Sequence, residues 1–268
     1  PGVWSSFASE SGREVVQQNL GVPIDVVADM VASVHEGRAI NSLEAELFPQ
    51  PLAAARRLGL TDDWVKRFES ADSGTRRVLT VTRLVGGSDA ARELQQGDLL
   101  LAIDGEVVTH FRGVERAVAN KPLVQVTVWR GAEARNIEVR TAALSGEGLT
   151  RVVLWAGATL HAPHRAMLAQ RSIPPEGIYV AYFAHGSPAT RAGLMPGRRI
   201  VEVDGQPTPD PDSFLKAVTG RPDRAPVRLK TITWNNAPEV ITLKLDKHYW
   251  PAYELRRIGD RWERYPLE

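Results

Sequence analysis

The most constraining feature of the sequence is a pattern that occurs twice, one hundred residues apart. Residues 94–105 and 194–205 each read Leu-x-x-Gly, then an apolar segment, then Asp-Gly. Each copy is followed by a segment of helical character that ends in Ala-Val, at residues 117–118 and 217–218. This period is too long for a solenoid repeat and suits a small domain. The sequence therefore predicts one domain type present twice.

Length and composition leave room for two such domains and exclude several kinds of chemistry. A chain of 268 residues can bury two separate cores of roughly 100 residues each. The net charge of +1 and the scattered basic residues argue against a nucleic-acid surface. The lack of cysteine excludes disulfides, thiolate nucleophiles and Cys-ligated zinc. No apolar run reaches the ~18 residues of a membrane span, so no span is expected. A start at Pro1 without a leader suggests an excised fragment or a processed product.

The hydrophobic pattern predicts the elements of the N-terminal segment and of the first copy. Before the first copy we expect a strand at 3–7, a helix at 11–19 and a second helix that begins with Val22-Pro23-Ile24, runs to about residue 36 and ends at Gly37. In the first copy we expect strands at 42–48, 78–84, 98–103, 124–129 and 136–140, helices at 51–58 and 111–119, and a one-turn helix capped by Ser88. Asp104-Gly105 should form a tight hairpin turn.

The second copy should repeat this order. We expect strands at 151–155, 178–183, 199–203, 227–233 and 240–245, helices at 163–170 and 212–218, a one-turn helix from Ser187, and a turn at 204–205. Residues 145–148, with the sequence Ser-Gly-Glu-Gly, are the expected linker. The C-terminal tail is too rich in Tyr and Trp to be a disordered end, so we expect it to pack back on a domain.

The second copy resembles a PDZ domain, specifically the circularly permuted PDZ domain of HtrA/DegP-type serine proteases. The resemblance rests on Gly-Ser-Pro-Ala at 186–189, Ala-Gly-Leu at 192–194, Gly197, and Val-Asp-Gly at 203–205. Ser-Pro-Ala opens a one-turn helix, and the glycine before leucine allows a sharp entry into the next strand. The first copy, at residues 87–97, lacks that glycine and is one residue shorter.

Three further segments, at 154–158, 161–166 and 248–257, are similar to the C-terminal tandem PDZ region of doubled HtrA/DegP-like proteases. That family includes the fungal nuclear HtrA-like protease and bacterial relatives. In it, a degenerate protease unit and further PDZ domains follow an active protease unit with its own PDZ domains. The resemblance implies an α+β, mainly β chain with PDZ-like domains built as small, partly open barrels or sandwiches capped by helices. It assigns 1–36 to the end of a degenerate trypsin-like domain with a linker helix, 37–144 and 150–245 to PDZ-like domains, and 246–268 to a tail that packs back. Bacterial HtrA proteins are periplasmic and the fungal relatives nuclear, so no single compartment is implied.

No catalytic or metal-binding constellation is apparent. Trypsin-like catalysis requires Ser, His and Asp with an oxyanion hole, and the Gly-Asp-Ser-Gly-Gly motif is absent. Asp72-Ser73-Gly74 is a partial look-alike in a polar connection and is interpreted as a turn. His161 and His164 lack a third ligand at suitable spacing, so no metal is expected. We expect no cofactor and no enzyme activity from this chain, although the resemblance implies that its parent protein is a serine protease.

The resemblance also implies where a peptide would bind. A PDZ domain adds an extended peptide, usually a free C-terminus, as a strand beside one strand and one helix. In the first copy the corresponding residues are Ile40, Asn41, Ser42 and Leu43 with Val114, Ala117 and Val118. In the second they are Val153, Leu154 and Trp155 with Phe214, Ala217 and Val218. Carboxylate-binding loops of the family carry glycine, but neither 38–43 nor 151–155 contains one.

Three functional hypotheses remain open. In the first, the pair is a non-catalytic part of an HtrA-like protease that binds peptide C-termini, extended segments or the protease domains of the same protein. In the second, it is a structural scaffold or homo-oligomerisation module whose grooves are filled by the protein itself. Residual hydrolase activity is the third. A C-terminal peptide library would separate the first two, and a casein or fluorophosphonate assay would test the third.

Overall fold

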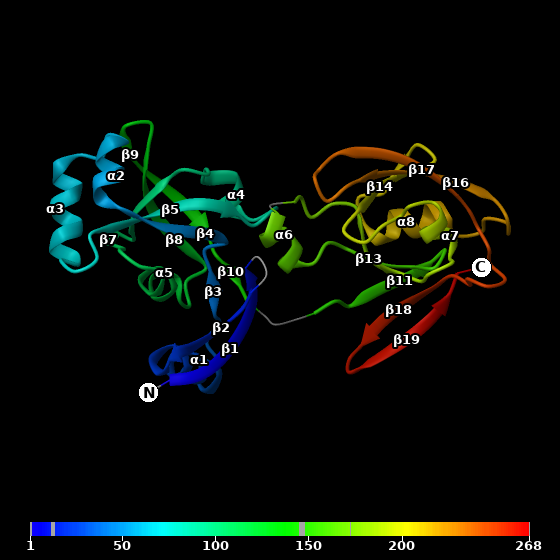
Figure 1. Cartoon of the computed structure of the whole chain (residues 1–268), viewed down its shortest axis with the longest axis horizontal. Helices are drawn as coiled ribbons and strands as arrows, with labels where there is room; N and C mark the ends of the chain where they lie inside the picture. The colour runs from blue at the N-terminus through cyan, green and yellow to red at the C-terminus, as the bar shows by residue number, and fades with distance from the viewer. Residues whose placement is uncertain (1, 12–13, 145–147, 172, 268) are drawn as a thin grey trace. The chain divides into compact units, whose positions relative to one another are not determined.

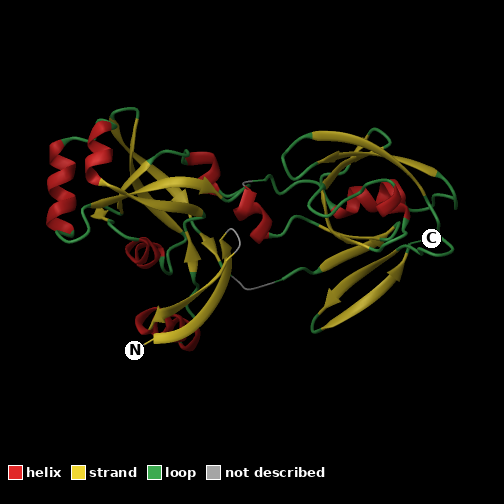
Figure 2. Ribbon diagram, in the orientation of Figure 1, coloured by secondary structure: helices red, strands yellow, loops and turns green. Residues whose placement is uncertain are grey.

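The computed structural model describes residues 2–11, 14–144, 148–171 and 173–267 (Figure 1). The chain divides into two compact units. Unit 1 comprises Pro1–Leu84 with Ser88–Ser145, and unit 2 comprises Val85–Gly87 with Gly146–Glu268. Both are built mainly of antiparallel strands with short helices, as Figure 2 shows. No helix in the described ranges is long and apolar enough to cross a membrane.

Unit 1 begins with a hairpin and a helix. Strand β1 (Gly2–Ser11) pairs along its whole length with β2 (Glu14–Pro23), and α1 (Ile24–His35) follows directly. The expected helix at 11–19 is therefore wrong, apart from residues 12 and 13, which lie outside the described part. Two consecutive valines at 15–16 favour a strand, and pairing with β1 satisfies the backbone of this segment. Helix α1 ends as expected, with Gly37 at a φ of 62°.

The main sheet of unit 1 has the order β4-β5-β6-β8-β9. Its strands are β4 (Ala45–Pro51), β5 (Arg77–Leu84), β6 (Leu99–Ile103), β8 (Leu123–Arg130) and β9 (Glu133–Arg140), with β7 (Glu106–Val107) beside β6. A separate pair joins β3 (Asn41–Ser42) to β10 (Ala142–Ala143). The single strand expected at 42–48 is thus broken, because Glu44 adopts a φ of 59° that no continuous strand allows.

Four helices accompany this sheet. Helix α4 (Asp89–Glu93) is capped by the Ser88 hydroxyl, and α5 (Phe111–Val118) buries Val114 and Val118 against the main core. Helices α2 (Leu52–Arg57) and α3 (Asp62–Ala71) cover a second cluster that contains Phe68. Helix α3 was not expected from the sequence, although Thr61 followed by two aspartates is typical of a helix start.

Unit 2 repeats the strand order of unit 1. Its order β17-β16-β14-β13-β12 corresponds one to one with β9-β8-β6-β5-β4. The strands are β12 (Ala158–His161), β13 (Ile178–Phe183), β14 (Arg199–Val203), β16 (Pro226–Ile232) and β17 (Pro238–Lys244), with β15 (Gln206–Pro207) beside β14. The helices are α6 (Arg165–Arg171), α7 (Pro188–Arg191) and α8 (Pro211–Val218).

Three further strands extend the sheet of unit 2 beyond β12. Strand β11 (Arg151–Trp155) pairs with β12 on one side and with β18 (Tyr253–Ile258) on the other. Strand β19 (Arg261–Pro266) completes a C-terminal hairpin with β18. The aromatic tail is therefore a part of the sheet.

Candidate functional site

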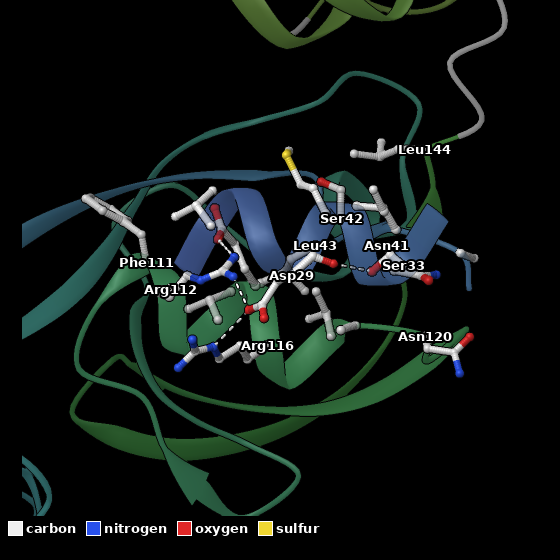
Figure 3. A pocket seen from close by; sticks show the side chains of 18 of the residues that line it. Asp29, Ser33, Asn41, Ser42, Leu43, Phe111, Arg112, Arg116, Asn120 and Leu144 are labelled. Atoms are coloured by element: carbon white, nitrogen blue, oxygen red, sulfur yellow. Dashed lines mark hydrogen bonds and ion pairs between the residues drawn. The ribbon is translucent and has the colours of Figure 1, made fainter. Parts of the chain in front are cut away.

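Unit 1 contains a cavity of about 710 Å³ beside helix α5. Its walls come from α1, from the segment that carries β3 and the start of β4, and from α5 (Figure 3). Apolar side chains, among them Leu43, Leu47, Phe111 and Val118, alternate with charged and amide side chains along these walls. A mostly apolar cleft with a few polar groups is the usual form of a ligand site.

Nearly all of the residues predicted for the first copy surround this cavity. Ile40, Asn41, Ser42, Leu43, Val114 and Val118 line it. Ala117 does not line it and instead packs, partly buried, against the main core of the unit. Residues more than seventy positions apart in the sequence are thus brought to one place.

The cavity lies along an edge of the main sheet. Among the described strands, β4 pairs with β5 only, and it stands last in the strand order. Ala45, Glu46 and Leu47 of β4 contribute to the cavity wall. An edge strand with one side unpaired presents backbone N–H and C=O groups that can accept another strand.

Two buried polar atoms of the wall make no hydrogen bond. They are Asn41 Oδ1 and Arg112 Nε. Asn41 is held from its other side, where Nδ2 donates to Thr141 Oγ1 at 2.8 Å. Buried polar atoms without a partner are rare in folded proteins. Their presence here gives the cavity one unused acceptor and one unused donor.

Helix α1 contributes an ionic wall that we did not predict. Asp25 and Asp29 face Arg112 and Arg116 of α5, and Arg112 also contacts Glu115 at 2.7 Å. The hydrogen bond to Glu115, and then the charge of Asp29, raise the pKa of Arg112. The sequence held a usable signal, because two acidic residues and two basic residues each stand four positions apart.

The corresponding edge in unit 2 is occupied. Strand β11 pairs with β12, with Val153 opposite Leu160 and Trp155 opposite Ala158. Because β12 corresponds to β4, β11 lies where β4 has no second partner. Trp155 packs edge-on against Phe214 of α8 at 5.5 Å between ring centroids.

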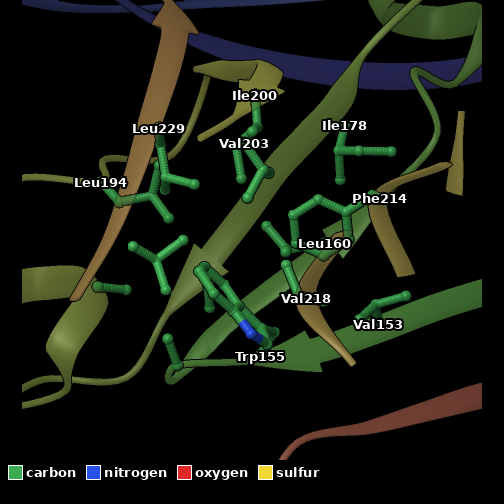
Figure 4. Packing of buried hydrophobic residues seen from close by; sticks show 14 of the residues in the cluster. Val153, Trp155, Leu160, Ile178, Leu194, Ile200, Val203, Phe214, Val218 and Leu229 are labelled. Carbon is green, nitrogen blue, oxygen red and sulfur yellow. The ribbon is translucent and has the colours of Figure 1, made fainter. Parts of the chain in front are cut away.

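The residues predicted for the second copy therefore form a core and not an open groove, as Figure 4 shows. Val153, Trp155, Phe214 and Val218 are buried, while Leu154 and Ala217 are partly buried. The prediction took β11 for the strand that receives a peptide. The structure shows that β11 is an added strand, whose far edge is itself paired with β18.

A two-residue turn makes this arrangement possible. Ala156 and Gly157 connect β11 to β12 with φ angles of 53° and 82°. A Cβ atom on Gly157 would lie 2.1 Å from the Cβ of Ser187, so only glycine fits here. At the other side of β11, the buried carboxylate of Glu254 accepts a hydrogen bond from Arg151 Nε at 2.6 Å.

The other His and Asp residues singled out from the sequence make contacts that stabilise local structure. His161 is buried, its Nδ1 lies 2.6 Å from the Ala162 carbonyl oxygen, and burial lowers its pKa. Over the ranges that the structure describes, no three His, Cys, Asp or Glu side chains are grouped to hold a metal. Asp104 and Asp204 each accept a backbone N–H of a neighbouring strand at 2.8 Å, from Gln125 of β8 and Arg228 of β16. The Asp72 carboxylate caps its own turn by accepting from the Gly74 N–H at 3.0 Å.

Comparison with known proteins agrees with this fold. The PDZ-like domain family matches residues 149–224. Protease Do-like 7 of Arabidopsis thaliana is 34% identical over 95% of this chain and 26% of its own length. The pro-apoptotic serine protease nma111 of Aspergillus oryzae is 29% identical over 94% of this chain and 25% of its own length.

The chain thus contains a PDZ-like domain. It is homologous over about 95% of its length to the C-terminal portion of Do-like, HtrA-type serine proteases. It spans about a quarter of the length of the relatives that it matches. Solved structures of the HtrA-type protease AlgW, with a tripeptide and with a decapeptide, match at TM-scores of 0.34 and 0.31 with 19% and 11% identity. They cover 53% and 90% of this chain and 45% and 92% of their own. These likenesses are too low to support any further argument.

Proposed function

We propose that unit 1 binds an extended peptide segment, which adds to the outer edge of β4 and lies against α5. The observation that carries this proposal is the contrast between the two units. In unit 1 the edge of β4 borders a cavity of about 710 Å³, whereas in unit 2 the same edge is filled by β11. Addition of a strand to a sheet edge gives affinity through backbone hydrogen bonds, and side-chain pockets give selectivity.

In this proposal the chain is the non-catalytic recognition part of an HtrA-type serine protease, with unit 1 as a PDZ-like domain too. Homology to proteins named as serine proteases supports this role, and the chain lacks the Gly-Asp-Ser-Gly-Gly motif of a trypsin-like nucleophile. Peptide capture in unit 1 would then bring segments of substrates, or of the protease itself, close to a protease domain.

A peptide library measured by fluorescence polarisation on the whole chain tests the proposal. Phe111→Ala should weaken the best peptide about fivefold or more, because Phe111 lines the cavity. Leu58→Ala is the control, since Leu58 is also a large exposed apolar residue of unit 1, but it follows α2 and does not line the cavity. Peptides with alternate backbone amides methylated should bind far more weakly if a strand is added.

Hydrogen exchange locates the site. A bound peptide should slow amide exchange in β4 and leave β12 unchanged, because β12 already has partners on both sides. The proposal is wrong if no peptide binds, or if binding is indifferent to both Phe111→Ala and amide methylation.

The closed edge of unit 2 favours a second function for that unit alone. A sheet that fills its own groove with β11 and then adds β18 and β19 fits a structural module. Sedimentation of the whole chain tests whether this module self-associates, and a strictly monomeric chain would leave it a role in bracing neighbouring domains.

A further inference from the structure

We propose that the groove of unit 1 selects peptides that carry two carboxylate side chains two residues apart. In this proposal Arg112 and Arg116 bind these carboxylates, and Asp25 and Asp29 of α1 occupy the same guanidinium groups when no peptide is bound. This inference rests on the proposed function, because it names the ligand chemistry of the same groove. Helix α1 then acts as an internal competitor for the site.

The first support is the set of contacts between the two helices. Arg112 and Arg116 both contact Asp29, and the distance from Arg116 is 3.4 Å (Figure 3). Arg112 and Arg116 also contact Asp25, at 3.9 and 3.4 Å. Both arginines and Asp29 line the cavity, whereas Asp25 pairs with the arginines without lining it. The two arginines therefore already hold two side-chain carboxylates, one of which stands at the cavity wall.

The second support is the way in which α1 is held. None of its side chains is buried, and Ile24, Met30, Val31 and Val34 are all exposed. Asp25 and Asp29 are about half exposed, at 52% and 50%. Ion pairs at this exposure contribute little stability and weaken with salt. A ligand with its own carboxylates can therefore displace these contacts without disrupting a core.

The third support is spacing. Arg112 and Arg116 stand one turn apart on α5, which corresponds to a rise of about 6 Å. In an extended strand, side chains two residues apart lie on the same face and are separated by about 6.7 Å. A strand that runs along α5 can thus present carboxylates at positions i and i+2 to the two arginines in turn.

The positive charge of Arg116 is balanced by ion pairs with α1. Arg112 keeps a contact with Glu115 whether or not α1 is present, and Arg38 is paired with Glu36. Among the described residues, Arg116 has ion pairs only with Asp25 and Asp29. Loss of α1 from the site would expose an uncompensated guanidinium, which favours an acidic ligand over a neutral one.

Two polar atoms of the cavity wall that lack a hydrogen bond could bind a ligand. Arg112 Nε has no hydrogen bond, and Asn41 Oδ1 can accept one. The segment 38–43 contains no glycine to turn its amides towards a terminal carboxylate. Side-chain carboxylates are for this reason the anionic groups that we assign to the ligand.

The test compares three labelled peptides on the whole 268-residue chain. They share one apolar sequence and carry Asp-x-Asp, Asn-x-Asn, or Asn-x-Asn with a free C-terminus in place of an amide. We expect Asp-x-Asp to bind about three- to tenfold more tightly than Asn-x-Asn at low salt. That preference should shrink as the salt concentration rises. A preference for the free C-terminus alone would overturn the assignment to side chains.

Two double variants separate the roles of the helices. D25N/D29N should bind Asp-x-Asp about three- to tenfold more tightly, because the internal competitor is gone, and R112Q/R116Q should lose the preference for Asp-x-Asp. The matched controls D62N/D63N and R56Q/R57Q change the net charge equally at exposed positions of α3 and α2 that do not line the cavity, and should change neither value. Weaker binding of all peptides by D25N/D29N would show that α1 builds the site and does not compete for it.

These outcomes remain distinct from failure of the proposed function. If no peptide binds in any arm, the groove is not a peptide site. If peptides bind, respond to Phe111→Ala and ignore the charge variants, the groove binds peptides but the acidic selectivity is wrong.

Discussion

Replacement of Trp155 by alanine tests most directly whether unit 2 fills its own groove. The side chain is only 2% exposed and packs against Phe214 of α8, with 5.5 Å between the ring centroids. Truncation of a buried aromatic side chain costs about 3–5 kcal/mol, because transfer energy is lost and a cavity is left. Loss of the edge-to-face contact with Phe214 accounts for about 0.5–1.5 kcal/mol of this cost. We expect Trp155→Ala to lower the free energy of unfolding of unit 2 by about 4 kcal/mol.

Amide hydrogen exchange with mass spectrometry is the suitable assay, because it reads each unit separately. A loss of about 4 kcal/mol should speed exchange of the slowest amides of β12 and β13 by nearly a thousandfold. The slowest amides of β5, in unit 1, are the internal control and should not change. Trp234→Ala, at a tryptophan of unit 2 that is 39% exposed, should cost less than about 1 kcal/mol.

The reasoning fails if Trp155→Ala costs less than about 1 kcal/mol. In that case β11 lies on β12 without filling the space beside α8, and unit 2 retains room for a ligand. Equal acceleration in β5 and β12 would show that the two compact units unfold together.

Two further predictions concern buried ionisable groups, one in each unit. Burial lowers the pKa of His161, so the unfolded chain binds the proton more tightly, and the stability of unit 2 should fall as the pH drops through about 6.5. His161→Gln should flatten this dependence between pH 7.5 and 5 in urea titrations, and an unchanged slope would assign it to another group. In unit 1, the carboxylate of Asp98 is 1% exposed and accepts two hydrogen bonds from Arg130, at 2.7 and 2.6 Å. Asp98→Asn leaves this guanidinium without its charge partner and should cost about 3 kcal/mol in urea unfolding, whereas a loss below 1 kcal/mol would show that the pair is dispensable.

The repeated scaffold was predictable because its signals are local. The hairpin turns at Asp104 and Asp204 each combine an aspartate of positive φ with a following glycine. The one-turn helices follow a serine cap, at Ser88 and Ser187, whose hydroxyl accepts from the backbone as expected. These residues determine their own conformation over three or four positions, so the sequence shows them directly.

The misses occurred where pairing decides the structure. The segment 14–23 has no strict alternation, and it becomes a strand because β1 lies beside it. Strand β12 is only four residues long and was not predicted from the sequence. Its extended conformation depends on its pairing with β11 and β13. The role of α1 at the cavity also depends on a tertiary contact, between residues 25–29 and 112–116. Such contacts leave only a weak trace in one sequence, here the matched spacing of opposite charges.

The difference between the two edges follows from a few residues that precede the equivalent strands. In unit 2, Ala156 and Gly157 form a two-residue turn with positive φ at both positions, which is the geometry that returns a chain directly onto the neighbouring strand. Strand β11 is thereby obliged to pair with β12 and to place Trp155 beside α8. In unit 1 only Glu44 has a positive φ at this point, and β3 pairs with β10 instead of β4. A short turn thus decides whether the edge of a duplicated sheet stays unpaired or is covered by the protein's own chain.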